Sequence, residues 1–400
     1  MKRFLVIYIV VTACSIPSKQ KEFNTPLSKL INHDNPAGPN TSLPHLVRGP
    51  ENALYFSWVE KAGDTTVFNY STFRDNTWSA PIRIASGANW FVNWADYPMV
   101  SAVKDGKMAH FLAKSSAGTY SYDVNLITEQ KGKWSEAFIP HTDGTPTEHG
   151  FVTMLPLTDS TFQVAWLDGR NTGGDHGHGD GAMTLRTAVI GLDGSINEET
   201  ELDNRTCDCC QTGGAITSNG PVFVYRDRSE LEIRDIYITR KVDGQWTEPR
   251  PIAKDNWKIA GCPVNGPRAD ALGTNLGVAW YTAANGQPKV QVIFSTNAGE
   301  TFGEPITIDA QSPLGRVDLS MIDEESAMVS WLTKEGDLSL IKARRVFRNR
   351  SMEAPIVISQ TSDSRGSGFP QMAKVGNELF FAWTVLEGEN TSIDMAKLTL

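Results

Sequence analysis

The chain has 400 residues, with 46 aspartates and glutamates against 37 lysines and arginines, which gives a net charge of −9. This acidic balance disfavours nucleic acids and anionic lipid surfaces as partners, because both attract basic proteins. The composition shows no linker-like change between residue 45 and the C-terminus, so we expect one large domain rather than two.

The first residues have the features of an export signal. Lys2 and Arg3 are positively charged, an apolar run follows from Phe4 to Val11, and small residues precede Cys14. The apolar run is far shorter than the roughly 20 residues that a membrane-spanning helix needs. The order of an aliphatic residue, two small residues and a cysteine resembles the processing site of bacterial lipoproteins. This resemblance implies cleavage before Cys14 and a lipid on its sulfur.

The segment that follows is polar and rich in Pro, Asn and Ser, which is typical of a tether. We therefore divide the chain into a signal peptide (1–13), a lipid-anchored tether (14–44) and a folded body (45–400). The mature protein is expected in the cell envelope as a membrane-anchored lipoprotein. We expect it to be anchored in the outer membrane. Its folded body could face either the periplasm or the cell surface.

The body contains a repeat. A short β-branched or aromatic run that ends in a large ring recurs at intervals of 51 to 59 residues. The seven rings are Trp58, Phe111, Trp166, Tyr225, Trp280, Trp331 and Trp383. Each run is preceded by a second short strand and a turn, and most are followed by an alternating strand and an outer-strand segment such as "GQWTEPRPI" at 244.

Four strands in each unit of about 50 residues, without a helical period, predict an all-β fold, a β-propeller of four-stranded blades. Seven rings favour seven blades, with six as the alternative. The last repeat ends after its third strand at Leu400, so its outer strand must come from elsewhere in the chain. We expect a strand near residues 26–31 to close the ring.

One turn carries a family resemblance. The string "FSTNAGETFGEP" at 294–305 is similar to the Asp-box turn of sialidases and other BNR-repeat proteins, with Ser295, Asn297, Gly299 and Phe302 at the motif positions. In such a turn the small polar side chains hydrogen-bond the hairpin backbone, glycine has a positive φ, and the ring packs between blades. The resemblance implies a sialidase-like propeller. The "RIP" segment of sialidases has its nearest counterpart in "PIRI" at 81–84, which is an outer-strand segment here.

Two classes of loop open on one face of a propeller: those that lead into each inner strand, and those between the second and third strands. The strings that are rich in chemistry fall in these loops, among them "NWFVNWADYP" at 89, "TPTEHGF" at 145, "NRTCDCCQTGG" at 204 and "YRDRSELEIRD" at 225. Function has to be argued from such a site rather than from the fold. We therefore expect the functional site on this face.

Four cysteines are expected to meet there, because two adjacent loops carry them: Cys207, Cys209, Cys210 and Cys262. Two disulfides are one interpretation, since thiols outside the cytoplasm commonly pair. A thiolate site for copper or zinc is the second, assisted by His149 or by His176 and His178 of the Gly-rich loop "GGDHGHGDG" at 173–181. A redox-active pair is the third. The Gly-rich loop itself is either a metal ligand or a solvated loop.

Arginines are unusually frequent on the same loops: Arg170, Arg226, Arg228, Arg234, Arg316 and Arg365. Guanidinium groups bind carboxylates through two hydrogen bonds, so these residues could hold an acidic sugar. Because Asp227, Glu230, Glu232 and Asp235 alternate with them, a self-neutralising network is the alternative. Trp94 could stack on a sugar ring or pack between blades.

If the site hydrolyses glycosides, as the resemblance implies, a tyrosine or carboxylate would attack the anomeric carbon and an acid would protonate the leaving group. The catalytic candidates are Asp96, Tyr97, Glu148 and Asp168. The first hypothesis is therefore a lipid-anchored, sialidase-like glycoside hydrolase or glycan-binding protein for an acidic sugar. The second is a copper- or zinc-binding or redox lipoprotein. Neither hypothesis includes nucleic acid as a partner.

Overall fold

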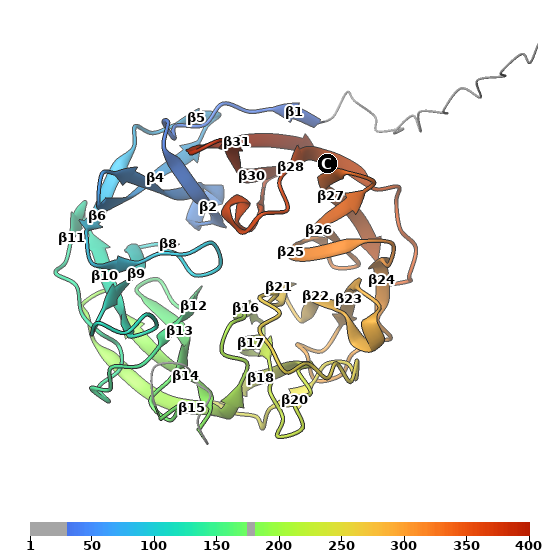
Figure 1. Cartoon of the computed structure of the whole chain (residues 1–400), viewed down its shortest axis with the longest axis horizontal. Helices are drawn as coiled ribbons and strands as arrows, with labels where there is room; N and C mark the ends of the chain where they lie inside the picture. Colours follow the sequence, from blue (N-terminus) through green and yellow to red (C-terminus); the bar gives the residue numbers. More distant parts are fainter. Residues whose placement is uncertain (1–29, 174–180) are drawn as a thin grey trace, which may run out of the picture.

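The structure is a computed structural model that describes residues 30–173 and 181–400. In this part of the chain seven antiparallel sheets surround a common axis, which is a seven-bladed β-propeller (Figure 1). The predicted all-β class and the seven blades are confirmed, and the alternative of six is excluded. Helix is limited in these residues to three 3-10 turns, η1 (Pro50–Asn52), η2 (Ala284–Gly286) and η3 (Arg365–Ser367).

The first four blades follow one another along the chain. Blade 1 contains β2 (Thr41–Arg48), β3 (Leu54–Ala62), β4 (Thr65–Arg74), β5 (Thr77–Trp78) and β6 (Ile82–Gly87). Blade 2 contains β7 (Trp90–Phe91), β8 (Met99–Val103), β9 (Gly106–Lys114), β10 (Tyr122–Gln130) and β11 (Lys133–Trp134). Blade 3 contains β12 (His149–Pro156), β13 (Thr161–Asp168), β14 (Met183–Gly191) and β15 (Ile196–Thr206). Blade 4 contains β16 (Gly213–Thr217), β17 (Gly220–Arg226), β18 (Ile236–Val242), β19 (Gln245–Trp246) and β20 (Arg250–Pro251).

The remaining blades complete the ring. Blade 5 contains β21 (Arg268–Leu272), β22 (Asn275–Thr282), β23 (Lys289–Ser295) and β24 (Ile306–Asp309). Blade 6 contains β25 (Pro313–Asp323), β26 (Ser326–Glu335), β27 (Leu338–Phe347) and β28 (Ile356–Thr361). Blade 7 contains β29 (Gln371–Val375), β30 (Glu378–Glu387), β31 (Asn390–Thr399) and, as its outer strand, β1 (Leu30–Asn32).

The seven repeated rings lie on the second strand of each blade, and all of them are buried. The hydrophobic core is divided into clusters that each join two adjacent blades. Three indole N–H groups donate to carboxylates within this core: Trp166 to Asp168, Trp280 to Asp255 and Trp331 to Asp309. Each of these buried indoles therefore has the hydrogen-bond partner that a buried tryptophan requires.

An N-terminal strand closes the ring, as predicted. Leu30 lies opposite Leu398, and the amide of His33 donates to the carbonyl of Met395 at 2.9 Å. Figure 1 shows β1 alongside β31 at the outer edge of blade 7. Residues 30–32 and 41–44, which fall within the expected tether, lie in strands β1 and β2 of the ring.

The inner strands surround a channel of about 280 Å³. Three aspartates next to this channel make the same contact with the following blade. Asp96 Oδ2 accepts from the amide of Phe151 at 2.9 Å, Asp270 Oδ2 from that of Met321 at 2.8 Å, and Asp318 Oδ2 from that of Met372 at 2.6 Å. These carboxylates join neighbouring blades at the centre of the ring.

The turn at 295–302 has the expected hydrogen bonds. Ser295 Oγ accepts from the amides of Asn297 and Gly299, at 3.2 and 2.9 Å, and Asn297 Oδ1 accepts from the amide of Thr301 at 2.9 Å. Gly299 has a φ of +78°, and Phe302 packs against the core between blades 4 and 5. Among the described residues, no helix is both long enough and apolar enough to span a membrane.

Candidate functional site

Glu148 is half-buried and directly precedes an inner strand on the loop face, whereas the other three catalytic candidates are buried. It directly precedes β12, and its Oε1 accepts a hydrogen bond of 2.5 Å from the hydroxyl of Tyr122 at the start of β10. Burial raises the pKa of Glu148 to about 8. The contact between Tyr122 and Glu148 was not predicted, because Tyr122 belongs to the neighbouring blade and is 26 residues from Glu148 in the sequence.

Asp96 and Tyr97 are completely enclosed. Asp96 forms the contact with Phe151 described above, and burial raises its pKa to about 7. The Tyr97 side chain is 1% exposed, and its hydroxyl has no hydrogen-bond partner among the described residues. Both residues are buried below the loop face, although Asp96 lines the central channel, and their catalytic role stays a prediction.

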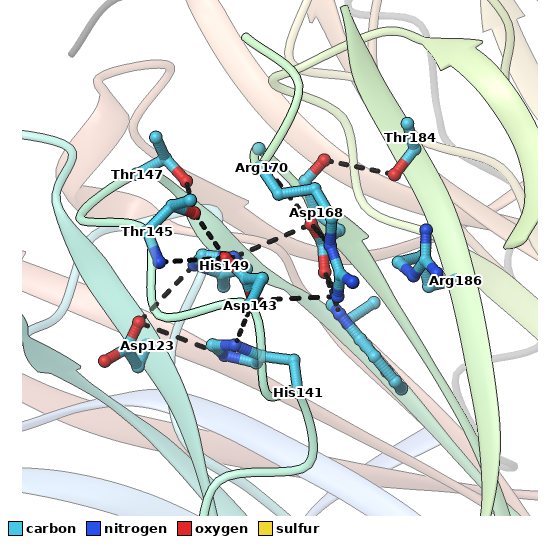
Figure 2. Close-up of polar contacts among 12 residues, drawn as sticks. Asp123, His141, Asp143, Thr145, Thr147, His149, Asp168, Arg170, Thr184 and Arg186 are labelled. Atoms are coloured by element: carbon cyan, nitrogen blue, oxygen red, sulfur yellow. Dashed lines mark hydrogen bonds and ion pairs between the residues drawn. The ribbon is translucent and has the colours of Figure 1, made fainter. Parts of the chain in front are cut away.

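Asp168 ends β13 and is engaged on both carboxylate oxygens. Arg170 Nε donates to Oδ1 at 2.8 Å and Arg170 Nη2 to Oδ2 at 2.7 Å, while the indole of Trp166 also donates to Oδ2. Burial opposes ionisation of Asp168, but these hydrogen bonds outweigh it and lower the pKa. The Asp168 and Arg170 pair therefore stays ionised, within the group of residues drawn in Figure 2.

Two of the predicted arginines are bound to main-chain carbonyls. Arg226 donates to the carbonyls of Asn265, Tyr281 and Arg234, and its guanidinium lies 4.8 Å from the ring centroid of Trp257. Arg316 donates to the carbonyls of three residues that lead into blade 7: Asp363, Ser364 and Gly368. Both guanidinium groups hold loops together and are buried.

Arg228 and Arg234 share one carboxylate. Glu232 Oε1 accepts from Arg228 at 2.8 Å, and Oε2 accepts from Arg234 at 2.9 Å. This is the self-neutralising arrangement considered above. Arg234 also donates to the sulfur of Cys207 at 3.1 Å, which connects the pair to the cysteines.

Arg365 is exposed, unlike the other predicted arginines. It lies in η3, 5.9 Å from the ring centroid of Trp94, and within residues 30–173 and 181–400 it forms no ion pair. A groove of about 630 Å³ lies beside it and includes Trp94, Asn93, Lys61 and Gly366 in its lining. This part of the loop face offers the exposed Arg365 guanidinium next to a partly exposed aromatic ring, in a groove that Glu60 and Asp64 also line.

The four cysteines meet, as expected from their loops. Cys207 Sγ lies 3.6 Å from Cys209 Sγ and 3.7 Å from Cys210 Sγ, and Cys262 contacts Asp208 beside Cys209. These distances exceed the S–S bond of about 2.05 Å, so the four are free thiols in this structure. The choice between disulfide, metal and redox site stays a prediction.

The thiols differ in acidity. Burial raises the pKa of Cys207 to about 11. Burial acts in the same direction on Cys210, but hydrogen bonds from Cys207 and Cys209 outweigh it and hold the pKa of Cys210 well below the usual range. The main-chain amide of Asn265 also donates to Cys210 Sγ at 3.4 Å. The cluster is therefore able to hold at least one thiolate.

His149 does not join the cysteines. It lies in a separate group with His141, Asp123, Asp143 and Asp168, and no described cysteine is part of that group (Figure 2). The signal that was missed is the string "HTDGT" at 141–145, just before the loop segment that the sequence analysis selected. The predicted ligands His176 and His178 and the predicted lipid site Cys14 lie outside the described residues.

The fold is a seven-bladed β-propeller, and solved structures of other proteins match it over most of the chain at low sequence identity. A PL25 ulvan lyase bound to -[GlcA(1-4)Rha3S]- matches with a TM-score of 0.56 and 11% identity over 91% of this chain and 95% of that chain. The polysaccharide lyase Uly1 matches with a TM-score of 0.51 and 9% identity over 92% and 91%. The phage phi92 endosialidase matches with a TM-score of 0.46 and 9% identity over 93% and 69%.

These similarities establish the fold. No protein-family model matches the sequence, and a search of curated proteins gave no significant match. Structural neighbours of the chain thus include polysaccharide lyases and sialidases, whereas membership of one family does not follow from the comparisons.

Proposed function

We propose that the protein is a lipid-anchored, extracytoplasmic propeller that binds or cleaves an acidic glycan at its loop face. The observation that carries this proposal is Arg365, an exposed guanidinium without an ion-pair partner among the described residues, beside Trp94 and a groove. Guanidinium groups bind carboxylates strongly, and aromatic rings next to polar groups are common in ligand sites. The ulvan lyase with this fold binds a glucuronate-containing oligosaccharide, which is consistent with an acidic ligand.

For cleavage, Glu148 is the group that can exchange a proton with substrate. Its carboxyl group is oriented by the hydroxyl of Tyr122, and burial raises its pKa to about 8, so it holds a proton near neutral pH. A carboxyl group held in this way can act as general acid at a glycosidic oxygen or as general base towards a sugar proton. Hydrolysis and elimination would both need this step.

The experiment measures binding and cleavage with the purified protein. Glucuronate- and sialate-containing oligosaccharides are compared with neutral ones of equal length. We expect acidic ligands to bind, and Arg365→Ala to weaken binding by about tenfold or more, because a hydrogen bond between charged groups is lost. Arg83→Ala, an exposed arginine on β6, is the matched control and should bind normally.

Glu148→Gln separates the two forms of the proposal. Loss of product formation with unchanged binding identifies an enzyme, whereas binding without product from the unaltered protein identifies a lectin-like function. Equal binding of acidic and neutral oligosaccharides, unaffected by Arg365→Ala, would overturn the proposal.

The lipid anchor is tested separately. Cys14→Ser should move the protein from the membrane fraction to the soluble envelope fraction, and mass spectrometry of the unaltered protein should show acylated Cys14 at the N-terminus. A membrane-bound Cys14→Ser protein would contradict the anchor without affecting the glycan site.

A second function is favoured by the meeting of four thiols from two loops. Cysteine sulfur is a preferred ligand of zinc and of Cu(I), so Cys207, Cys209, Cys210 and Cys262 could form a metal or redox site. Free thiols and bound metal are measured together on Cys14→Ser protein. One metal per chain that is lost in Cys209→Ser would support a thiolate site, whereas four blocked thiols without metal would identify disulfides.

A further inference from the structure

Two histidines and three aspartates meet between blades 2 and 3, apart from the thiols and from Arg365. Asp123 is the second residue of β10, His141 and Asp143 lie in the connection to blade 3, His149 begins β12, and Asp168 ends β13. Figure 2 shows their side chains pointing toward one another. The proposed glycan function leaves this group unexplained.

The two imidazoles are buried without adequate hydrogen bonds. Their rings stack with centroids 3.9 Å apart and planes 10° from parallel, and their side chains are 3% and 0% exposed. Both ring nitrogens of His149 and Nε2 of His141 have no partner of hydrogen-bond geometry among the described residues. Buried polar groups in native proteins are nearly always paired, so these nitrogens indicate a missing ligand.

Three of the potential ligand atoms, from Asp123, His141 and His149, lie within 4.8 Å of one another. Asp123 Oδ1 lies 3.4 Å from His149 Nδ1 and 3.9 Å from His141 Nε2. Ligand atoms about 2.0–2.2 Å from a tetrahedral ion are separated by roughly 3.3–3.6 Å. The two distances from Asp123 are close to these values, and a change in ring orientation would bring the three atoms into position around one ion.

The opposite nitrogens face other carboxylates. His141 Nδ1 lies 2.9 Å from Asp143 Oδ1, and His149 Nε2 lies 3.4 Å from Asp143 Oδ2 and 3.6 Å from Asp168 Oδ1. Histidines that bind a metal through one nitrogen commonly donate the other N–H to a carboxylate. Asp143 is itself held by the amide of Thr145 at 3.1 Å, so it can orient both rings.

The local charge matches a divalent ion. The group contains three carboxylates, and one arginine, Arg170, contacts Asp168 at 2.7 Å and Asp143 at 3.6 Å. With both imidazoles neutral, two negative charges remain. Glu199 also contacts Arg170 at 3.2 Å and adds a further carboxylate beside the group, so the site favours a cation.

We propose that His141 Nε2, His149 Nδ1 and Asp123 Oδ1 bind a divalent transition-metal ion such as zinc, with Asp143 orienting both imidazoles. Two nitrogens and one carboxylate are ligands that zinc accepts, and three protein ligands leave a position for water or substrate. Because imidazole lone pairs lie in the ring plane, the stacked rings must tilt apart when the ion binds.

Cobalt distinguishes this site from the cysteines. The protein is treated with chelator, and Co²⁺ is titrated into the Cys209→Ser variant while absorption is recorded. We expect one Co²⁺ per chain with d–d bands and without the charge-transfer band of a thiolate ligand. NMR of the imidazole protons should show both rings shifting at one equivalent of Zn²⁺.

Ligand variants complete the test, with folding checked by circular dichroism. His149→Gln should abolish this binding, and Asp143→Asn, which keeps both imidazoles, should weaken it by about 10–100-fold. Asp105→Asn, at an exposed aspartate of blade 2 outside the group, is the matched control for Asp143→Asn and should bind normally. Retention of the ion in His149→Gln, or no binding by folded Cys209→Ser protein, would overturn the proposal and leave a pair of histidines that share a proton with the aspartates.

Discussion

Asp96, Asp270 and Asp318 each satisfy a main-chain amide of the next blade from a buried position. The amide has no access to water there, so the carboxylate is its hydrogen-bond partner. The same contact occurs in three blades. It explains why Asp96 is buried although it belongs to a loop that leads into an inner strand. Its function is to fix the spacing of inner strands.

Removal of this contact should destabilise the fold. We expect Asp96→Ala to lower the free energy of unfolding by about 1–3 kcal/mol, because the amide of Phe151 loses its partner. Urea denaturation at pH 6 measures the change. Asp394→Ala, an exposed aspartate on β31, is the control and should change stability by less than about 0.5 kcal/mol. Equal effects in the two variants would contradict the assigned role.

Individual site residues were only partly predictable. Asp96 and Glu148 both lie in loops that lead into inner strands. Their contacts with Phe151 and Tyr122 come from residues that are 55 and 26 positions away in the sequence. His141 and Asp123 come from different elements, so their meeting depends on how blade 2 packs against blade 3. A single sequence records neither contact.

Strand β1 is short, but its surroundings hold blades 1 and 7 together. The ring of His33 packs edge-on against Phe73 of blade 1 at 5.2 Å and Phe380 of blade 7 at 5.3 Å. The indole of Trp78 donates to the carbonyl of Asp34 at 2.9 Å. Closure of the ring therefore involves side chains as well as strand pairing.

Weakening this segment should loosen the whole ring. We expect His33→Ala in the full chain to lower the free energy of unfolding by about 1–2 kcal/mol, since ring contacts between two blades are lost. Ile31→Thr changes an exposed side chain of the same strand and should have little effect. Thermal unfolding of both variants tests the difference, and similar melting temperatures would contradict it.

The hairpin turn after β23 provides another test. Ser295→Ala removes an oxygen that accepts from two amides, and we expect a loss of about 1–3 kcal/mol in unfolding free energy. Ser86→Ala, on an exposed part of β6, is the matched control. Denaturant unfolding gives both values, and a neutral Ser295→Ala would show that water replaces the hydroxyl group.

Elements were more predictable than sites because their signal is local and repeated. The run that ends in a large ring marks the second strand of every blade, so one pattern located seven strands. The closing strand was predicted from a missing partner, since the last repeat lacks its fourth strand. The limit of the tether was harder to place, because residues 33–40 are polar although they lie between two strands of the ring.

Several buried groups make the stability of the whole molecule depend on pH. Burial raises the pKa of Asp96 to about 7 and that of Asp318 to about 6, so their favourable contribution is lost as pH rises from about 4 to 7. Burial lowers the pKa of His45 and His110 to about 3, so their contribution is lost as pH falls from 6.5 to 3. The two effects oppose each other between about pH 4 and 6.5.

We therefore expect a plateau of melting temperature between about pH 4 and 6.5, with a decline on both sides. Above this range the buried carboxyl groups lose their protons, which destabilises the fold. Below it the buried histidines must take up protons, which also destabilises the fold. Asp96→Asn keeps an acceptor for Phe151 but cannot ionise, so it should reduce the decline between pH 6.5 and 8. Calorimetry of both proteins across this range is the measurement, and parallel curves would contradict the assignment to Asp96.

The pairing of β1 with β31 brings the two ends of the ring to the same place. Leu30 lies directly opposite Leu398 in an antiparallel pair, which is how the two strands of an ordinary hairpin lie. A short turn could therefore join Leu400 to Leu30, and the chain could be opened instead at an exposed turn of another blade. Such a circular permutant should fold to the same ring, because the position of the chain ends is incidental to an architecture made of equivalent sectors.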